Sequence, residues 1–204
     1  MELPTSIIEA LNDPYNETPK ENDACFKNTQ NYLVMTPKMV LQESMGTLKK
    51  AGFEVVYLGD DLEGEASDLG KAHAVLALKA AQTNRKICIL SGGETTVTMK
   101  GKGRGGRNTE YLLSMALHLN GAPNIYALAG DTDGVDGTQD NAGAMIDPTT
   151  LDRATAKGLN LKTYLESNDS YSAFEALNDL VVTGPTMTNV NDFRAILIFP
   201  KGVE

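Results

Sequence analysis

The sequence predicts an α/β fold in which a mostly parallel or mixed β-sheet is flanked by helices. Short apolar runs rich in Val, Ile and Leu alternate with longer stretches of helical period, an order typical of strand-helix-strand units. Turns rich in Gly, Pro and Asn separate these segments. With 204 residues, 41% of them hydrophobic and 22% charged, the chain has the length and composition of one folded domain or two small ones.

Residues 1–30 are predicted to form an N-terminal linker segment, because a polar stretch with Pro14 and Pro19 resists a packed helix or a central strand. Residues 31–204 are predicted to form the α/β domain. Its first part, 31–85, is expected to hold a strand over 32–35, a helix over 39–50, a strand over 54–58 and a helix over 65–81. This strand-helix-strand order predicts parallel pairing.

The second part, 86–204, opens with a buried strand over 86–90 and then becomes irregular, since residues 91–106 hold six glycines. Only a short strand over 97–99 is expected there. The later elements are expected as a helix over 111–119 with Asn108 as its N-cap, a strand over 125–129, short helices over 148–157 and 161–166, and strands over 180–183 and 194–199. The last two strands are candidates for an antiparallel C-terminal pair.

Charge and cysteine content exclude several classes of function. The formal net charge is −9 and the pI is about 4.8, so long-range attraction to nucleic acids or to anionic membranes has the wrong sign. Cys25 and Cys88 are too few and too far apart for a disulfide framework. No apolar run approaches the ~20 residues of a membrane span and residues 1–10 do not resemble a signal peptide, so we expect a cytoplasmic protein.

A basic, glycine-rich stretch over residues 100–108 precedes a predicted helix and is the first candidate site. Its cations are Lys100, Lys102, Arg104 and Arg107, and its glycines are Gly101, Gly103, Gly105 and Gly106. Backbone N–H groups without flanking side chains, the positive end of a helix dipole and a guanidinium all favour a phosphate or a carboxylate. The spacing satisfies G-x-G-x-x-G, but a P-loop would need Lys and Ser or Thr where Arg107 and Asn108 stand. A flexible, solvated loop is the alternative.

Two further polar stretches follow predicted strands. Residues 91–96 come after a buried strand, at the end where ligands gather in open α/β sheets. The candidate contacts there are Gly92, Gly93, Glu94 and Thr95. Asp131, Asp133 and Asp136 follow the strand over 125–129 and could bind Mg²⁺ or accept the proton of a substrate hydroxyl. Plain turns are the alternative in both places.

Other polar residues carry a weaker signal. The clusters 168–171 and 184–192 hold side chains that hydrogen-bond well, but such clusters are also common as helix caps and turns. His73 and His118 lie in predicted helices without a partner at metal-ligand spacing, so structural roles are expected for both.

Five motifs, in order, resemble the MOFRL domain of class II glycerate 2-kinases, a family often labelled hydroxypyruvate reductase. They are SGGETTV (91–97), GKGRGGRN (101–108), AGDTDGVDG (129–137), NDSY (168–171) and GPTMTNVND (184–192). The stretches 16–20 and 62–66 are similar to the same family, so the likeness covers nearly the whole chain. Family members are about twice as long, with an N-terminal Rossmann-like half and an active site in the cleft between the two halves.

The resemblance implies ATP- and Mg²⁺-dependent phosphoryl transfer to a hydroxyl of glycerate. The catalytic residues it implies are Lys102, Arg107 and Asp133. The metal ligands it implies are Asp131, Asp133 and Asp136. The substrate- or phosphate-binding residues it implies are Gly92, Gly93, Glu94, Thr95, Lys100, Gly103, Arg104, Gly105, Gly106, Asn108, Thr188, Asn189 and Asn191.

The sequence departs from the family at two positions. Met187 stands where a glycine is usual, and Thr109 where a glutamine is usual. The methionine could crowd a close backbone approach in the loop 186–191.

Two other functions stay open: reduction of hydroxypyruvate with NAD(P)H, and a catalytically silent ligand-binding module or subunit of a split enzyme. The expected partners are glycerate and a separate N-terminal domain or subunit; a homo-oligomer is also open, whereas nucleic acids and membranes are not expected.

Overall fold

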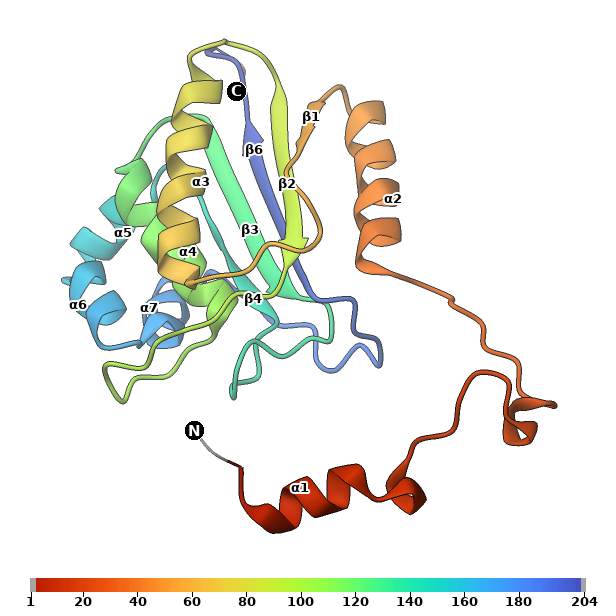
Figure 1. The fold of residues 1–204 in the computed structure, drawn as a ribbon. Coiled ribbons are helices and arrows are strands. Elements are labelled where there is room, and N and C mark those ends of the chain that lie inside the picture. Colours follow the sequence, from red (N-terminus) through yellow and green to blue (C-terminus); the bar gives the residue numbers. More distant parts are fainter. Residues whose placement is uncertain (1–2, 203–204) are drawn as a thin grey trace. The chain divides into compact units, whose positions relative to one another are not determined.

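The computed structural model describes residues 3–202 of the chain, which divides into two compact units after Val34. The first unit holds helix α1 (Thr5–Asn12) and two 3-10 turns, and its described side chains are all exposed (Figure 1). The 3-10 turns are Pro14–Asn16 and Ala24–Phe26. The strand predicted over 32–35 is wrong: these residues pair with no strand, and the side chain of Leu33 is 80% exposed.

The second unit is built on one six-stranded mixed sheet. Its strands are β1 (Glu54–Tyr57), β2 (Ile87–Gly93), β3 (Ile125–Asp131), β4 (Gly143–Ile146), β5 (Leu180–Val181) and β6 (Asp192–Ile198). The order across the sheet is β1-β2-β6-β3-β4-β5. Strands β1 and β2 pair in parallel, and the other described pairs are antiparallel. The predicted α/β class with a mixed sheet is confirmed.

Strand β6 lies antiparallel between β2 and β3 along its whole length. Its first residue, Asp192, pairs with Gly93 of β2 and with Asp131 of β3. The predicted pairing of the two C-terminal strands with each other is wrong, because β5 pairs with β4 instead. Apolar side chains on both faces from Ala195 to Ile198 suit β6 to a central position, whereas β5 pairs through only two residues.

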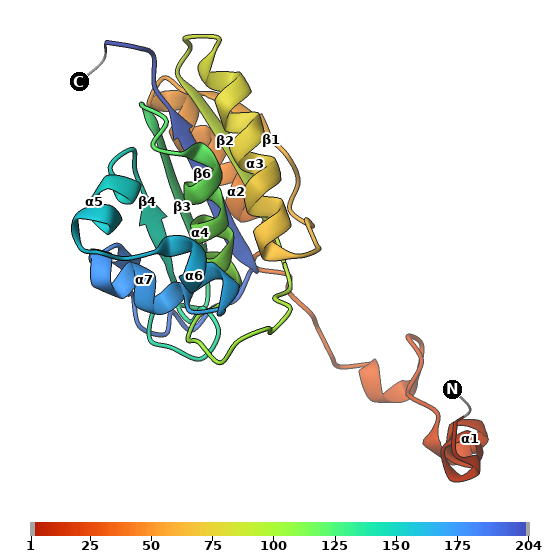
Figure 2. The same ribbon diagram turned by 90° about the vertical axis from the view of Figure 1, so that its left-hand side faces the viewer.

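Helices cover the two faces of the sheet unequally (Figures 1 and 2). Helices α3 (Ala66–Ala81) and α4 (Arg107–Leu119) lie on one face, and α2 (Pro37–Lys50) packs on the other against β1 and β2. The short helices are α5 (Thr150–Ala156), α6 (Leu161–Glu166) and α7 (Ser170–Leu177). In residues 3–202 no helix has both the length and the apolar composition needed to cross a bilayer.

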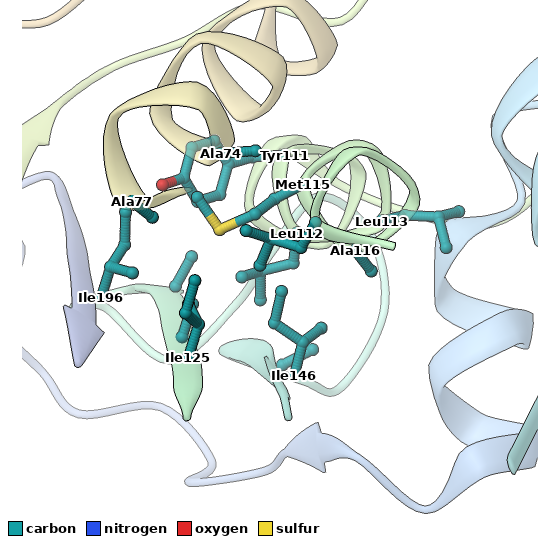
Figure 3. Packing of buried hydrophobic residues seen from close by; sticks show 14 of the residues in the cluster. Ala74, Ala77, Tyr111, Leu112, Leu113, Met115, Ala116, Ile125, Ile146 and Ile196 are labelled. Atoms are coloured by element: carbon teal, nitrogen blue, oxygen red, sulfur yellow. The ribbon is translucent and has the colours of Figure 1, made fainter. Parts of the chain in front are cut away.

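The main core lies between α3, α4 and the sheet (Figure 3). Ala74 of α3, Met115 of α4 and Ile196 of β6 meet there and are almost fully buried. Small residues let the two helices approach closely, because a Cβ atom added at Gly70 of α3 would overlap the carbonyl oxygen of Tyr111. Burial of this apolar surface at close packing is the main force that holds α3 and α4 on the sheet.

Several other predicted elements differ from the structure. Residues 97–99 form no strand, and helix α4 begins at Arg107 with Gly106 as its N-cap, so Asn108 lies inside the helix. Strand β4 and helix α7 were not predicted. The four residues of β4 are too few for a periodic signal, and the polar start of α7 is typical of a turn.

The variant Gly70→Ala is expected to lower the free energy of unfolding by about 1–2 kcal/mol, because overlap with α4 outweighs the better helix propensity of alanine. Gly46→Ala in α2 is the matched control, since nothing lies within 4 Å of a Cβ atom there. It is expected to stabilise the protein by about 0.5–1 kcal/mol. Urea unfolding of both variants measures the difference, and effects of the same sign would contradict the close contact of α3 with α4.

His73 lies buried between α3 and α4, with Nδ1 2.9 Å from the hydroxyl oxygen of Tyr111. Burial, helped by the charge of Arg194, lowers the pKa of His73 from 6.5 to about 4. The unfolded chain therefore binds this proton first, so stability is intact above pH 6.5 and falls as the pH drops towards 4. Between pH 7 and pH 4, the free energy of unfolding of the wild type should fall by about 3 kcal/mol more than that of His73→Gln. Urea unfolding at a series of pH values measures both. Parallel profiles would show that the imidazole is not held neutral.

Candidate functional site

Arg107 lies where three central strands and a helix meet. Strands β2 and β3 end at Gly93 and Asp131, and the antiparallel β6 begins at Asp192 beside both of them. Arg107 is the first residue of α4. The site therefore lies at the carboxyl ends of β2 and β3, the edge of an α/β sheet where ligands commonly bind.

The guanidinium of Arg107 is surrounded by three carboxylates. Its Nη1 lies 2.7 Å from Glu94, its Nη2 lies 2.7 Å from Asp131, and its Nε lies 3.3 Å from Asp192. The side chain of Glu94 is 61% exposed, whereas those of Asp131 and Asp192 are 5% and 0% exposed. Two motifs that are distant in sequence, the turn after β2 and the acidic loop after β3, thus meet at one arginine.

Asp192 is bound through both of its carboxylate oxygens. Oδ1 accepts hydrogen bonds from Arg107 Nε and from Asn108 Nδ2 at 2.8 Å, and Oδ2 accepts one from Nη2 of Arg194 at 2.6 Å. Arg194 is 1% exposed. Sequence reasoning missed Asp192 and Arg194 as site residues. The available signal was an arginine in an otherwise apolar, alternating strand, since arginine is almost never fully buried unless it is paired.

Burial and charge shift the pKa values in this cluster. Burial raises the pKa of Asp131, against the hydrogen bond from the backbone of Asp133, and raises that of Asp192, against the charge of Arg194. Burial alone lowers the pKa of Arg107, but the charge of Asp192 and the hydrogen bonds to the other two carboxylates outweigh it, and the pKa lies above its usual range. Arg107 is therefore a permanent cation.

The N-terminus of α4 already holds an anion, the carboxylate of Asp136. Its Oδ1 accepts the backbone N–H of Asn108 at 3.0 Å, and its Oδ2 accepts the backbone N–H of Thr109 at 2.9 Å and the Thr109 hydroxyl at 2.8 Å. Asp136 is 1% exposed. An anion at this helix start was predicted, but the anion belongs to the protein itself. The assignments of Asp136 to a metal and of Asn108 to a ligand are corrected accordingly.

Residues 167–170 bind the backbone of the glycine-rich loop. Asn168 Oδ1 accepts two of its N–H groups, at 2.6 and 2.9 Å. The loop N–H groups with partners inside the protein are those of Lys100, Gly101, Gly103, Arg104 and Gly106. These five groups are therefore not free to hold a phosphate. The NDSY motif, whose role the sequence left open, anchors this loop.

The glycines of the loop serve close packing. A Cβ atom added at any of them would overlap either the segment 167–170 or Asp136. These glycines are Gly101, Gly103, Gly105 and Gly106. Their lack of side chains lets the loop approach its neighbours, which accounts for the glycines without a bound phosphate. Their part in phosphate binding stays a prediction.

The other cations of the loop have different surroundings. Arg104 pairs with Glu175 at 2.9 Å and its guanidinium lies 4.7 Å from the ring centre of Tyr171. Lys100 lines a separate polar pocket of about 270 Å³ together with Glu110, Glu166 and Asn168. Lys102 is exposed. The structure therefore does not bring Lys100 and Arg104 to the Arg107 cluster.

The turn after β2 contributes one side chain to the cluster. Gly93 has a φ of +119°, and a Cβ atom there would overlap Leu62, so this glycine is required by the backbone. Gly92 packs against Leu41, and Thr95 is 2% exposed and accepts a hydrogen bond from Arg194. The sequence singled out Gly92, Gly93, Glu94 and Thr95; in the structure, Glu94 is the one among them that contacts Arg107.

The loop 184–191 packs against the acidic loop after β3. The backbone N–H and the hydroxyl of Thr132 both donate to the carbonyl oxygen of Asn191, and the carbonyl oxygen of Asp133 accepts the N–H of Thr186 at 2.9 Å. The predicted contact residues on this loop are Thr188, Asn189 and Asn191, of which the first two are exposed. They border the acidic loop, so they remain candidates for ligand contact.

Met187 has a φ of +60° and its side chain is 94% exposed. A left-handed backbone favours glycine, which accounts for the glycine that is usual at this position in the family that the sequence resembles. The methionine points into solvent, and its effect on the close approach of a ligand stays a prediction.

No three His, Cys, Asp or Glu side chains in residues 3–202 are placed to hold a metal ion together. Asp131 Oδ2 contacts Arg107, and Asp131 Oδ1 accepts the N–H of Asp133. Asp133 Oδ1 accepts the N–H of Val135, while its Oδ2 has no partner in the described chain. The predicted three-carboxylate metal site is wrong, and Asp133 is the half-buried carboxylate with an oxygen left for a ligand.

Fold and site together define a mixed α/β domain with an arginine-carboxylate cluster at the carboxyl ends of its central strands. Residues 87–192 match the sequence pattern of the MOFRL family. Because this match covers more than half of the chain, from the start of β2 to the start of β6, the chain belongs to the MOFRL family. The resemblance predicted from the sequence is confirmed.

Relatives of the chain are more than twice its length. A protein of Agrobacterium vitis named "Putative hydroxypyruvate reductase" is 48% identical over 189 residues, which are 90% of this chain and 42% of that protein. The D-glycerate 2-kinase of Thermotoga maritima is 36% identical over 186 residues, 89% of this chain and 44% of that protein. A crystal structure of glycerate kinase from Thermotoga maritima superposes with a TM-score of 0.80 at 35% identity, covering 84% of this chain and 42% of that one. The chain spans less than half the length of each.

The variant Asp136→Asn is expected to lower the free energy of unfolding by about 2–3 kcal/mol, because an amide has one acceptor oxygen and leaves a buried N–H of α4 without a partner. Asp152→Asn, at an exposed position in α5, is the control and is expected to change stability by less than about 0.5 kcal/mol. Thermal unfolding measures both. Equal melting temperatures for the two variants would mean that Asp136 does not stabilise the helix.

Proposed function

We propose that this chain provides the anion-binding wall of a glycerate kinase active site, with Arg107 as its central residue. The observation that carries the proposal is a single partly exposed guanidinium at the carboxyl ends of β2 and β3, held from the buried side by Asp131 and Asp192. The relatives named glycerate kinase support the choice of substrate.

Arg107 has donors left for a ligand. A guanidinium carries five N–H groups, and three of them contact Glu94, Asp131 and Asp192. The other two can bind the oxygens of a phosphoryl or carboxylate group in a bidentate manner. Glu94 is exposed and can turn away, whereas the two buried carboxylates stay and keep the guanidinium in place.

ATP is the proposed phosphoryl donor, with Mg²⁺ bound to its phosphates. Mg²⁺ in such sites keeps several waters and takes one or two protein carboxylates, so it does not require a three-carboxylate site in this chain. Since most N–H groups of the glycine-rich loop are bound internally, we expect the phosphates to be held by Arg107 and by the part of the relatives that this chain does not span.

The proposed reaction is transfer of the γ-phosphoryl group. The hydroxyl oxygen of glycerate bonds to the γ-phosphorus, the bond from that phosphorus to the ADP oxygen breaks, and the hydroxyl proton moves to a carboxylate. Asp133 is the proposed acceptor of this proton, and Arg107 neutralises charge on the transferring group. Lys102 is exposed on the glycine-rich loop, and its proposed role is contact with the nucleotide.

The test compares Arg107→Lys with the wild type, both as the chain alone and joined behind the N-terminal part of the Thermotoga maritima relative. The wild-type joined protein is expected to release ADP from ATP and glycerate. Arg107→Lys should lower its kcat by roughly 100-fold or more, because a lysine cannot reproduce the bidentate geometry. Arg104→Gln is the control: it removes a guanidinium that pairs with Glu175, so kcat should hold.

Two results would overturn the proposal. An unchanged rate in Arg107→Lys would remove this arginine from the site. Loss of NADH absorbance with hydroxypyruvate, without ADP release from ATP and glycerate, would make the protein a reductase.

A further inference from the structure

A line of buried contacts connects the core of the sheet to the Arg107 guanidinium. Arg194 Nη2 donates to Asp192 Oδ2 at 2.6 Å, and Asp192 Oδ1 accepts from Arg107 Nε. Arg194 and Asp192 are 1% and 2% exposed. Neither can touch a substrate from solvent, yet both are one or two contacts away from the side chain that is proposed to bind it.

The contact at Nε, the longest of the three at 3.3 Å, helps to fix the orientation of Arg107. Because Nε joins the guanidinium to the aliphatic part of the side chain, an acceptor at Nε sets the rotation of the guanidinium plane about the Cδ–Nε bond. Glu94 and Asp131 contact the two Nη atoms of the same guanidinium plane. Asp192 can serve as this acceptor because its other oxygen is held by Arg194.

Arg194 also holds the turn that carries Glu94. Its Nη1 donates to the carbonyl oxygen of Gly92 at 3.2 Å and its Nη2 lies 3.3 Å from the hydroxyl of Thr95. One buried arginine therefore locates two of the three carboxylates around Arg107: Asp192 directly, and Glu94 through its turn. Without Arg194, the buried Asp192 would lose its shorter ion pair and keep the longer one with Arg107 at 3.3 Å, a change that favours uptake of a proton.

We propose that Arg194 is a positioning residue for anion binding, acting through Asp192 and through the 92–95 turn on the orientation of Arg107. This inference rests on the proposed function, in which Arg107 binds the anionic group of the substrate. It assigns the buried pair a role in ligand binding that is separate from its contribution to stability.

The experiment uses the chain itself and two ways of removing the pair. Arg194→Met removes the guanidinium with little change in volume. Arg194→Met with Asp192→Asn also removes the buried charge, which the first change leaves with only its longer ion pair to Arg107, so that a folded variant is available if the first does not fold. Arg194→Lys keeps a cation beside Asp192. Arg153→Met is the matched control, because it removes an arginine that pairs with Asp179 at 2.8 Å in another part of the unit.

The first readout needs no ligand. In ¹⁵N NMR spectra, the Arg107 Nε–H resonance, assigned by its loss in Arg107→Lys, should exchange slowly with water in the wild type and in Arg153→Met. It should exchange rapidly in both Arg194→Met variants and recover in part in Arg194→Lys. A folded Arg194→Met variant with a slowly exchanging Nε–H overturns the proposal, since a merely structural role would leave this signal unchanged.

The second readout is titration with D-glycerate and with inorganic phosphate. Affinity should fall roughly tenfold in the Arg194→Met variants and hold in Arg153→Met. If Arg107→Lys loses affinity but the folded Arg194 variants do not, the positioning role is wrong and the proposed function stands. If the wild type binds neither anion while its Nε–H still depends on Arg194, the orientation holds and anion binding at Arg107 fails.

Discussion

The antiparallel insertion of β6 between β2 and β3 is the constraint on which the rest of this structure depends. It places the first residue of β6, Asp192, beside the ends of both neighbours, so that Gly93, Asp131 and Asp192 lie in one row across the sheet. Further along the same strand, Ile196 and Ile198 are buried in the main core. The apolar half of the strand therefore determines where its charged beginning must lie.

Charges at the beginning of β6 are buried, and buried charges require partners. Arg194 and Asp192 form an ion pair, and Asp192 also accepts hydrogen bonds from Asn108 and Arg107 at the start of α4. The cluster is thus continuous with the packing of the sheet and does not rest on a surface loop. A site held in this way can keep a guanidinium oriented without a ligand, which is the property that the proposed phosphoryl transfer uses most.

The glycine-rich loop illustrates how one sequence signal can have two physical origins. Bare backbone ahead of a helix suits a phosphate, but it suits close packing against other backbone equally well. Here the segment 167–170 and Asp136 occupy the space beside the glycines and bind several N–H groups of the loop and of the helix start, so the anion at the helix start is internal. The chain also spans less than half of its relatives' length.

Periodicity, turn residues and short motifs are local properties, and they were enough to predict the α/β class, the family and most helices and strands of residues 35–202. They also singled out Arg107, Glu94 and Asp131, which the structure brings together. Only the tertiary structure decided which carboxylates meet Arg107 and which cap a helix or anchor a loop. Asp131 and Asp136 look alike in one acidic motif, yet one faces a guanidinium and the other two backbone N–H groups. That difference arises from the strand order and from contacts between loops that are more than twenty residues apart in the sequence. A local sequence pattern therefore does not predict which partner each carboxylate contacts.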